Sequence, residues 1–327
     1  MVGIIDEIKP LMERFESTLV DIDPSEFVEV NEVVTHILTS GGKRLRPLLL
    51  LTAGEMVGLT EEHIFLACAV EMIHTATLLH DDVIDKSELR RGRPTANAEY
   101  GVPASILFGD YLYTKSLRLL LKYGNDRISN SLLSVVKLMS EGEIKQMLKS
   151  HSPDIGEAVY FEVIEAKTSC LFELSCDMAT LLILNKDHEY VRACHSYGHH
   201  FGNAFQITDD IIDYRSYTEV MGKTAGDDFA EGKVTLPLIH LLKNCSSAEK
   251  KMINDLLVLD QKNSDQIRRD RFPEIVDLMH RYHSFDYCDA VANREIESAR
   301  NSLKVFSDTV YKKSLISLAE QIADRRC

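Results

Sequence analysis

Glycine and proline are scarce in this chain, with 16 and 8 residues among 327. No proline lies between Pro153 and Pro237, so this stretch can hold long uninterrupted helices, because a proline inside a helix removes a hydrogen bond and clashes with the preceding turn. Strand-like alternation of apolar and polar residues is also absent. These absences exclude a β-rich fold and predict an all-α protein.

Positive charge, paired cysteines and a signal segment are missing as well. The net charge is -14, which argues against nucleic-acid binding, because affinity for a phosphate backbone needs clustered Lys and Arg. The seven cysteines are odd in number and form no CxxC pair, so we expect reduced thiols in a cytoplasmic protein. The first residues carry acids where a signal peptide has cations, and no run of about 18 apolar residues suggests a membrane span.

Apolar residues recur at helical spacing along most of the chain. Phe201, Ala204, Phe205 and Thr208 follow the i, i+3, i+4, i+7 pattern of a helix face. Residues 61–79 are apolar nearly all round, which is typical of a central helix buried by its neighbours. Further helices are expected at about 4–20, 26–38, 45–57, 104–122, 128–149, 157–183, 189–214, 234–243 and much of 247–322.

Four breaks separate these helices, at residues 40–42, 89–95, 150–156 and 219–233. None of them has the composition of a flexible linker between domains. We therefore predict one domain that spans residues 1–327.

An aspartate triplet of the pattern D-D-x-x-D occurs twice, each time at the end of an apolar run. The copies are residues 81–85 (DDVID) and 209–213 (DDIID). Positions i and i+4 share a helix face, so each copy places two carboxylates on one stripe with the third beside it. Carboxylate oxygens, substrate phosphates and water are the ligands that Mg²⁺ prefers. Two copies that face each other across a helical bundle could hold a diphosphate through shared Mg²⁺ ions.

Two other interpretations of the triplets remain open. One copy alone is compatible with a solvated acidic helix end, since short motifs carry false positives. Calcium fits less well, because neither copy has the alternating D-x-D-x-D-G loop with its closing glutamate. Six buried carboxylates would cost too much without neutralising cations, which favours the metal interpretation.

Basic residues accompany both acidic motifs. Residues 41–47 (GGKRLRP) open a helix, and Lys43 and Arg46 are three apart, so both can face one ligand. Arg90 and Arg91 follow the first triplet, where the guanidinium fork suits phosphate oxygens, and Lys223 follows the second. Clusters of this kind predict an anionic substrate.

Five segments together carry a resemblance to a known family. They are GGKRLRP, LLHDDVIDKSELRRGRPT, the pair Lys167-Thr168, FQITDDIIDY and the GK…EGKVTLPL tail. They resemble the trans-isoprenyl diphosphate synthases, or polyprenyl synthetases, most strongly over residues 30–245 and most closely their medium- and long-chain bacterial members. The resemblance implies a bundle of long antiparallel helices around a deep central cavity, and usually a homodimer.

The resemblance also implies roles for individual residues. Positions that bind isopentenyl diphosphate in the family match Lys43, Arg46, His74 and Arg91. Positions on the allylic diphosphate side match Arg90, Lys167, Thr168, Gln206 and Lys223, of which we expect Lys167, Thr168 and Gln206 to take part in catalysis. Gln206 has independent support, because it lies three and seven residues before Asp209 and Asp213 on their helix face.

The same resemblance implies different roles for the six aspartates. Asp81, Asp85 and Asp209 match direct Mg²⁺ ligands. Asp82, Asp210 and Asp213 are expected to hydrogen-bond metal-bound water instead.

The implied reaction joins isopentenyl diphosphate to an allylic diphosphate such as farnesyl diphosphate, with Mg²⁺. Ala76 and Thr77, about one turn before Asp81, are small where bulky aromatics close the pocket of short-chain relatives, which predicts a C40 product for a quinone side chain. The product would pass to the membrane. Other product lengths from C20 to C50, a terpene cyclase and a non-catalytic subunit of a heteromeric prenyltransferase are the alternatives.

Overall fold

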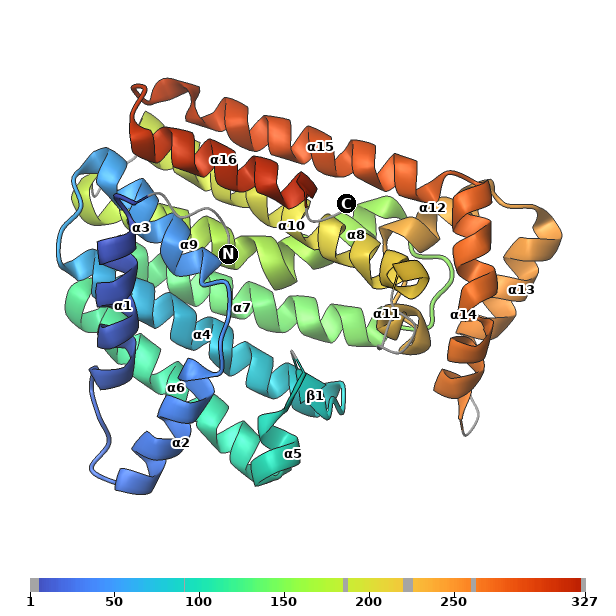
Figure 1. Ribbon diagram of the computed structural model, residues 1–327, viewed down its shortest axis with the longest axis horizontal. Coiled ribbons are helices and arrows are strands. Elements are labelled where there is room, and N and C mark those ends of the chain that lie inside the picture. Colours follow the sequence, from blue (N-terminus) through green and yellow to red (C-terminus); the bar gives the residue numbers. More distant parts are fainter. Residues whose placement is uncertain (1–5, 91, 185–187, 220–225, 260–262, 325–327) are drawn as a thin grey trace. The chain divides into compact units, whose positions relative to one another are not determined.

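The computed structural model describes residues 6–90, 92–184, 188–219, 226–259 and 263–324 (Figure 1). Helices make up almost all of these residues. Within the described ranges, strands occur only as the two-residue pair β1 (Leu89–Arg90) and β2 (Arg93–Pro94), which is antiparallel. The prediction of an all-α protein is confirmed.

The chain divides into two compact units. The first comprises Met1–Leu133, Leu174–His195 and Val305–Leu315, and the second comprises Ser134–Glu173, Ser196–Lys304 and Ile316–Cys327. That both units belong to one domain stays a prediction.

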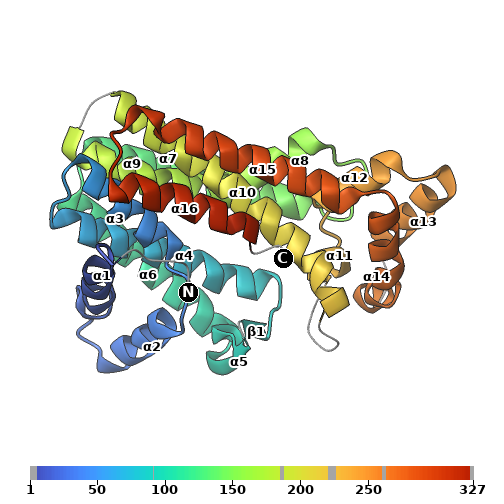
Figure 2. The ribbon, with the colours of Figure 1, turned by 45° about the horizontal axis from the view of Figure 1, so that its top comes forward.

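Helices of the N-terminal half belong mainly to the first unit. They are α1 (Lys9–Asp21), α2 (Val28–Thr39), α3 (Leu45–Val57), α4 (Glu62–Ile84), α5 (Ala96–Tyr100) and α6 (Val102–Tyr123). As its composition predicts, α4 is buried on most sides, and it runs alongside α6 (Figures 1 and 2).

Among the described helices, α4 is the one long and apolar enough to cross a membrane, with a mean hydropathy of 1.3 over 18 residues. It passes this test by length and composition only, which is weak evidence for a membrane span. Moreover, 72% of the run is buried inside the protein, and the core helix of a soluble protein passes the same test. At its start, the buried His63 contacts the Ala179 carbonyl through Nε2 at 2.9 Å and accepts the Thr60 N–H at Nδ1.

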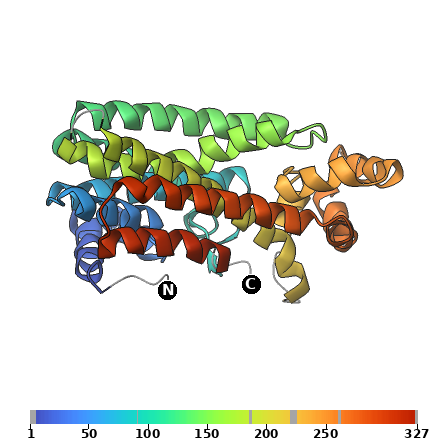
Figure 3. The same cartoon turned by 90° about the horizontal axis from the view of Figure 1, so that it is seen from above.

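The remaining helices belong to the second unit or are divided between the two units. They are α7 (Asp126–Lys149), α8 (Glu157–Ile164), η1 (Glu165–Ser169), α9 (Cys170–Leu184), α10 (Glu189–Glu219), α11 (Asp227–Ala230), α12 (Leu236–Asn244), α13 (Ser247–Leu257), α14 (Ser264–Arg281), α15 (Ser284–Ser302), η2 (Leu303–Val305) and α16 (Val310–Asp324). Helices α12, α13 and α14 gather at one end of this unit (Figure 3). A buried apolar cluster that includes Ile211, Leu238, Ile275 and Val291 joins α10, α12, α14 and α15.

Four segments differ from the sequence expectation. Helices α5 and α11 lie where no helix was expected. The break expected at 89–95 contains the β1–β2 pair, and the helix expected over 157–183 is divided into α8, η1 and α9. The middle piece, η1, is a π-helix, in which the Cys170 N–H donates to the Glu165 carbonyl five residues back. Single π-turns inside helices are frequent at functional sites. Lys167 and Thr168 lie in this one.

Candidate active site

The first aspartate motif ends α4, in the first unit. Asp81 and Asp85 are one turn apart and partly exposed, and the Asp85 N–H donates to the Asp81 carbonyl at 2.8 Å. Asp82 is buried, and the Arg90 guanidinium donates to it through Nε, at 2.9 and 3.1 Å from its two oxygens, and through Nη2 at 2.8 Å. One carboxylate of this motif is therefore neutralised by the protein, while two lie where a ligand can reach them.

The β1–β2 pair places Arg90 over the motif. Arg90 pairs with Arg93 across the strands, and Gly92, with φ of +75°, supplies the left-handed conformation that a tight turn needs. The Thr95 hydroxyl anchors the hairpin by donating to the Ser87 carbonyl at 2.7 Å.

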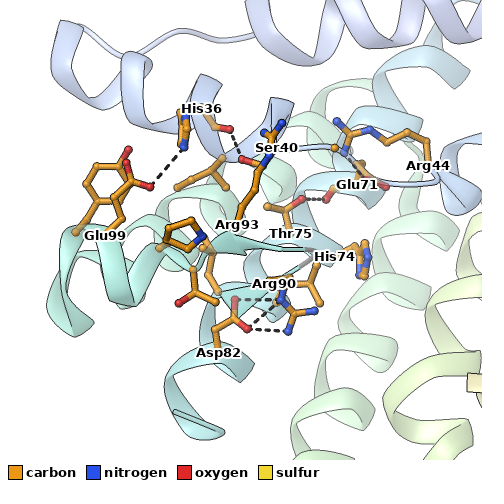
Figure 4. Close-up of a pocket in the computed structure, with 18 residues that line it drawn as sticks. His36, Ser40, Arg44, Glu71, His74, Thr75, Asp82, Arg90, Arg93 and Glu99 are labelled. Carbon is orange, nitrogen blue, oxygen red and sulfur yellow. Dashed lines mark hydrogen bonds and ion pairs between the residues drawn. The ribbon is translucent and has the colours of Figure 1, made fainter. Parts of the chain in front are cut away.

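A cavity of about 360 Å³ lies beside the motif within the first unit (Figure 4). Its apolar lining includes Ile37, Leu78 and Leu79, and its charged and polar lining comprises His36, Ser40, Arg44, Glu71, His74, Thr75, Asp82, Thr95, Arg90, Arg93, Glu99 and Tyr100. The cavity thus combines an apolar surface with groups of both charges, and Arg44 and Arg90 are paired there with Glu71 and Asp82. Of the predicted substrate residues, it brings together His74 and Arg90.

Lys43 and Arg46 flank the start of α3 and are not among the residues that line this cavity. Arg44, between them, holds the loop in place. Its backbone is left-handed, with φ of 48°, and its guanidinium binds Glu71 at 2.7 Å and Glu16 at 2.9 Å. Arg44 is held by these two carboxylates, whereas Lys43 is exposed and Arg46 is partly buried.

The second aspartate motif lies on α10, in the second unit. Asp210 is buried and accepts the Tyr160 hydroxyl at 2.6 Å and the Gln206 amide at 2.7 Å. Asp213 accepts the backbone N–H groups of residues 226–228 at 3.2 to 3.3 Å. Asp209 is partly exposed. As in the first motif, a buried carboxylate fixed by protein donors lies beside a partly exposed one.

Burial raises the pKa of the Asp210 carboxyl well above its usual range, and the negative charge of Asp228 adds to the effect. Burial and Asp228 also raise the pKa of the Asp213 carboxyl. A cation near such carboxyls favours their ionised form. The second motif is therefore an environment in which a metal ion would relieve an existing electrostatic cost.

The π-turn places Thr168 against Gln206 of this motif's helix and Lys167 against α7. The Thr168 hydroxyl donates to Gln206 Oε1 at 2.7 Å, and Gln206 Nε2 donates in turn to Asp210. Lys167 Nζ lies 2.9 Å from Gln146 Oε1 and 2.8 Å from a Glu143 carboxylate oxygen. The prediction of roles for Lys167 and Thr168 rests mainly on the resemblance, and it stays a prediction.

The other predicted residues are placed as follows. Ala76 is fully buried, and Thr77 is partly exposed with its hydroxyl donating to the His74 carbonyl at 2.8 Å. Neither lines the cavity beside the first motif. Arg91 and Lys223 lie outside the described residues.

Sequence reasoning missed Tyr160 and the structural role of Arg44. Tyr160 lies in an apolar run, so nothing in its spacing distinguishes it from an ordinary core aromatic. Arg44 could have been suspected, since three cations in one short loop exceed what one phosphate group needs. Only the fold shows which of them meets Glu16 and Glu71.

The oxygen donors fit Mg²⁺. Within the described ranges there is no cluster of three or more His, Cys, Asp or Glu side chains that could hold a metal ion by themselves. Mg²⁺ usually needs no such cage, because it binds through one or two carboxylates together with substrate phosphates and waters. The accessible pair Asp81 and Asp85 is a donor set of this kind.

Comparison with known proteins agrees with these features. The pattern of the polyprenyl synthetase family matches residues 28–273. The chain is 35% identical over 326 residues to the octaprenyl diphosphate synthase of Haemophilus influenzae, which covers 98% of this chain and 97% of that protein.

Two solved structures are similar over their whole lengths. A decaprenyl diphosphate synthase from Rhodobacter capsulatus superimposes with a TM-score of 0.90 and 34% identity, covering 98% of each chain. A polyprenyl synthase from Caulobacter crescentus CB15, complexed with calcium and isoprenyl diphosphate, gives a TM-score of 0.89 and 32% identity, covering 100% of this chain and 99% of that one. The chain therefore belongs to the polyprenyl synthetase family and is a trans-prenyl diphosphate synthase.

Proposed function

We propose that this enzyme condenses isopentenyl diphosphate with an allylic diphosphate, such as farnesyl diphosphate, to build a long all-trans polyprenyl diphosphate. The proposal rests on one observation, which is that the carboxylates within each aspartate motif have different environments. Each motif has one or more carboxylates fixed by protein donors and at least one that is accessible. Two motifs of this design suit Mg²⁺ ions that neutralise a charged leaving group.

Mg²⁺, when bound by Asp81, Asp85 and Asp209, would neutralise the diphosphate leaving group as a Lewis acid. Asp82, Asp210 and Asp213, fixed by the donors described above, are suited to orient metal-bound water. The basic residues Arg90, Lys167 and Lys223 add positive charge where negative charge develops on the departing diphosphate.

The second substrate is assigned to the basic residues near α3 and α4. Lys43, Arg46, His74 and Arg91 would bind the diphosphate of isopentenyl diphosphate, which has no other role than to hold its double bond in position. The allylic C–O bond breaks, the double bond attacks the resulting cation to form a C–C bond, and a proton is then lost to the released diphosphate. Apolar surroundings exclude water, which would otherwise capture the cation.

Gln206 and Thr168 are suited to stabilise this allylic cation. The Gln206 oxygen accepts from Thr168 while its amide group is held by Asp210, so the side chain has a fixed dipole. Gln206→Leu keeps the size of the side chain and removes that dipole, and we expect kcat to fall. An unchanged kcat would refute this role.

We further propose a C40 product for a quinone side chain, made by a homodimer in the cytoplasm. The small residues Ala76 and Thr77 support a long product. The relatives named above include an octaprenyl and a decaprenyl diphosphate synthase, so neighbouring lengths are the alternative. The six described cysteines are free thiols, as expected in a reducing compartment.

A two-substrate experiment separates this function from its rivals. The purified enzyme is incubated with Mg²⁺ and farnesyl diphosphate, with and without isopentenyl diphosphate, and released diphosphate is measured. A synthase releases diphosphate rapidly only when both substrates are present. Rapid release from farnesyl diphosphate alone would indicate a cyclase, and no release in either case would indicate a non-catalytic subunit.

A further inference from the structure

The π-turn η1 is held against α10 by buried polar contacts that the reaction itself does not require. The Ser169 hydroxyl donates to Asn203 Oδ1 at 2.6 Å, and both side chains are buried, with exposed fractions of 0% and 1%. One turn further along α10, Gln206 accepts from Thr168. Consecutive residues of the π-turn are therefore fixed by two residues on one face of α10.

Close backbone approach makes these contacts possible. A Cβ atom at Gly202 would lie 2.5 Å from Ser169 Cα, so only glycine allows α10 to pack this tightly on the π-turn. The i→i+5 turn has poorer intrinsic stability than an α-helix, so its shape depends on such external partners.

Asn203 is in turn fixed by a charged network. Its Nδ2 lies 3.2 Å from His199 Nε2 and 3.4 Å from a Glu295 carboxylate oxygen. His199 Nδ1 bonds Glu173 at 2.7 Å, so with Nδ1–H donated there, Nε2 accepts from Asn203. The amide oxygen of Asn203 is thereby directed at Ser169.

Three carboxylates surround His199. Glu173 lies on α9, Glu165 on the π-turn is 3.8 Å from Nε2, and Glu295 on α15 also binds Nδ1 of the neighbouring His200 at 2.7 Å. The hydrogen bond with Glu173 raises the pKa of His199 above its usual range. A proton on Nε2 would face the Asn203 N–H, so the contact with Asn203 needs an unprotonated Nε2.

We propose that Asn203 is a positioning residue, which fixes the π-turn through Ser169 so that Lys167 and Thr168 are held in the orientation that the allylic diphosphate needs. This role rests on the proposed function of Lys167 and Thr168. Asn203 itself touches no reacting atom. It acts through the shape of η1.

Truncation of either partner tests the proposal. Asn203→Ala and Ser169→Ala should each lower kcat by about tenfold to a hundredfold, as small misplacements of reacting groups do. The KM for isopentenyl diphosphate should stay unchanged, because its residues lie elsewhere. The double variant should lose no more than either single variant, since both remove the same bond.

Ser196→Ala is the matched control, because it removes another α10 hydroxyl contact, 2.8 Å from the Ser302 hydroxyl, without touching the π-turn. It should retain the activity of the unmodified enzyme. Circular dichroism and thermal unfolding on all variants measure the folded fraction. If kcat of Asn203→Ala falls only as far as the folded fraction does, or does not fall, Asn203 has no positioning role.

Asn203→Asp tests the proposal even if the alanine variant folds poorly. The new carboxylate still accepts the Ser169 hydroxyl, but it needs a proton on His199 Nε2 to replace the lost N–H contact. The activity of Asn203→Asp relative to the unmodified enzyme should therefore rise as the pH falls through the pKa of His199. A ratio independent of pH would overturn the proposal. An unmodified enzyme that elongates no substrate would overturn the proposed function as well.

Discussion

At the scale of single residues, the aspartates of the two motifs have different hydrogen-bond partners. Asp82 has a guanidinium partner, Asp210 has a phenol and an amide, and Asp213 has backbone N–H groups. Identical letters in the sequence therefore have different electrostatic environments. The difference supports, for each motif, a fixed scaffold with accessible ligands beside it.

Product length is a residue-scale property that α4 allows to be tested. Ala76 is fully buried, so a tyrosine there would disrupt packing as well as any pocket. Thr77 is partly exposed and lies one turn before Asp81, so Thr77→Phe is the better probe. We expect the phenyl ring to fill the pocket about one helix turn from Asp81 and so to shorten the product to about C15–C20. Thr77→Val keeps the volume and should leave the product length unchanged. Mass spectrometry of both products decides, and equal lengths would refute the assignment.

The buried His63 should make the free energy of unfolding depend on pH. Burial lowers the pKa of His63, so below about pH 6.5 the unfolded chain binds a proton that the folded chain resists. Its contribution to the free energy of unfolding is complete above pH 6.5 and is lost as the pH falls toward the folded pKa, by at most about 1.4 kcal/mol per pH unit.

Urea denaturation at pH 7.5 and 5.5 measures this effect. His63→Asn should lose less stability over the interval than the unmodified protein, since all other groups are shared. Equal losses in both proteins would contradict the assignment.

At the scale of elements, periodicity predicted the helices well and local irregularities poorly. The buried character of α4 and the start of α3 at Leu45 followed from apolar spacing and from the glycine pair before it. The π-turn could not be predicted, because its extra residue is stabilised by contacts with Asn203 and Gln206 that are more than 30 positions away. The ion pair of Asp82 with Arg90 likewise depends on a hairpin that the sequence pattern indicated only as a break.

The contact between α10 and the π-turn gives an element-scale prediction. Gly202→Ala places a methyl group 2.5 Å from Ser169 Cα, so the two elements must separate. We expect a loss of about 1–3 kcal/mol in the free energy of unfolding, together with lower kcat.

Gly156→Ala is the control, since nothing lies within 4 Å of its Cβ position and its φ is −92°. Both changes affect the unfolded chain equally. Equal stability of the two variants in urea denaturation would show that the close approach does not matter.

At the scale of the whole molecule, the family match extends over residues of both compact units. The first unit carries the first aspartate motif with Arg90, and the second carries the other motif with the π-turn. Neither unit holds the full set of proposed ligands. The proposed function therefore predicts that activity needs the aspartates of both motifs, which is the central claim.

Elongation of farnesyl diphosphate by the purified protein tests this claim most directly. The enzyme is given isopentenyl diphosphate with and without Mg²⁺, and the chain length of the product is determined by mass spectrometry. Asp81→Asn and Asp209→Asn, one change in each unit, serve as matched variants of nearly unchanged size. We predict a polyprenyl product centred on C40 that needs Mg²⁺ and is nearly abolished by either change. Full elongation without Mg²⁺, or by either variant, would contradict the account.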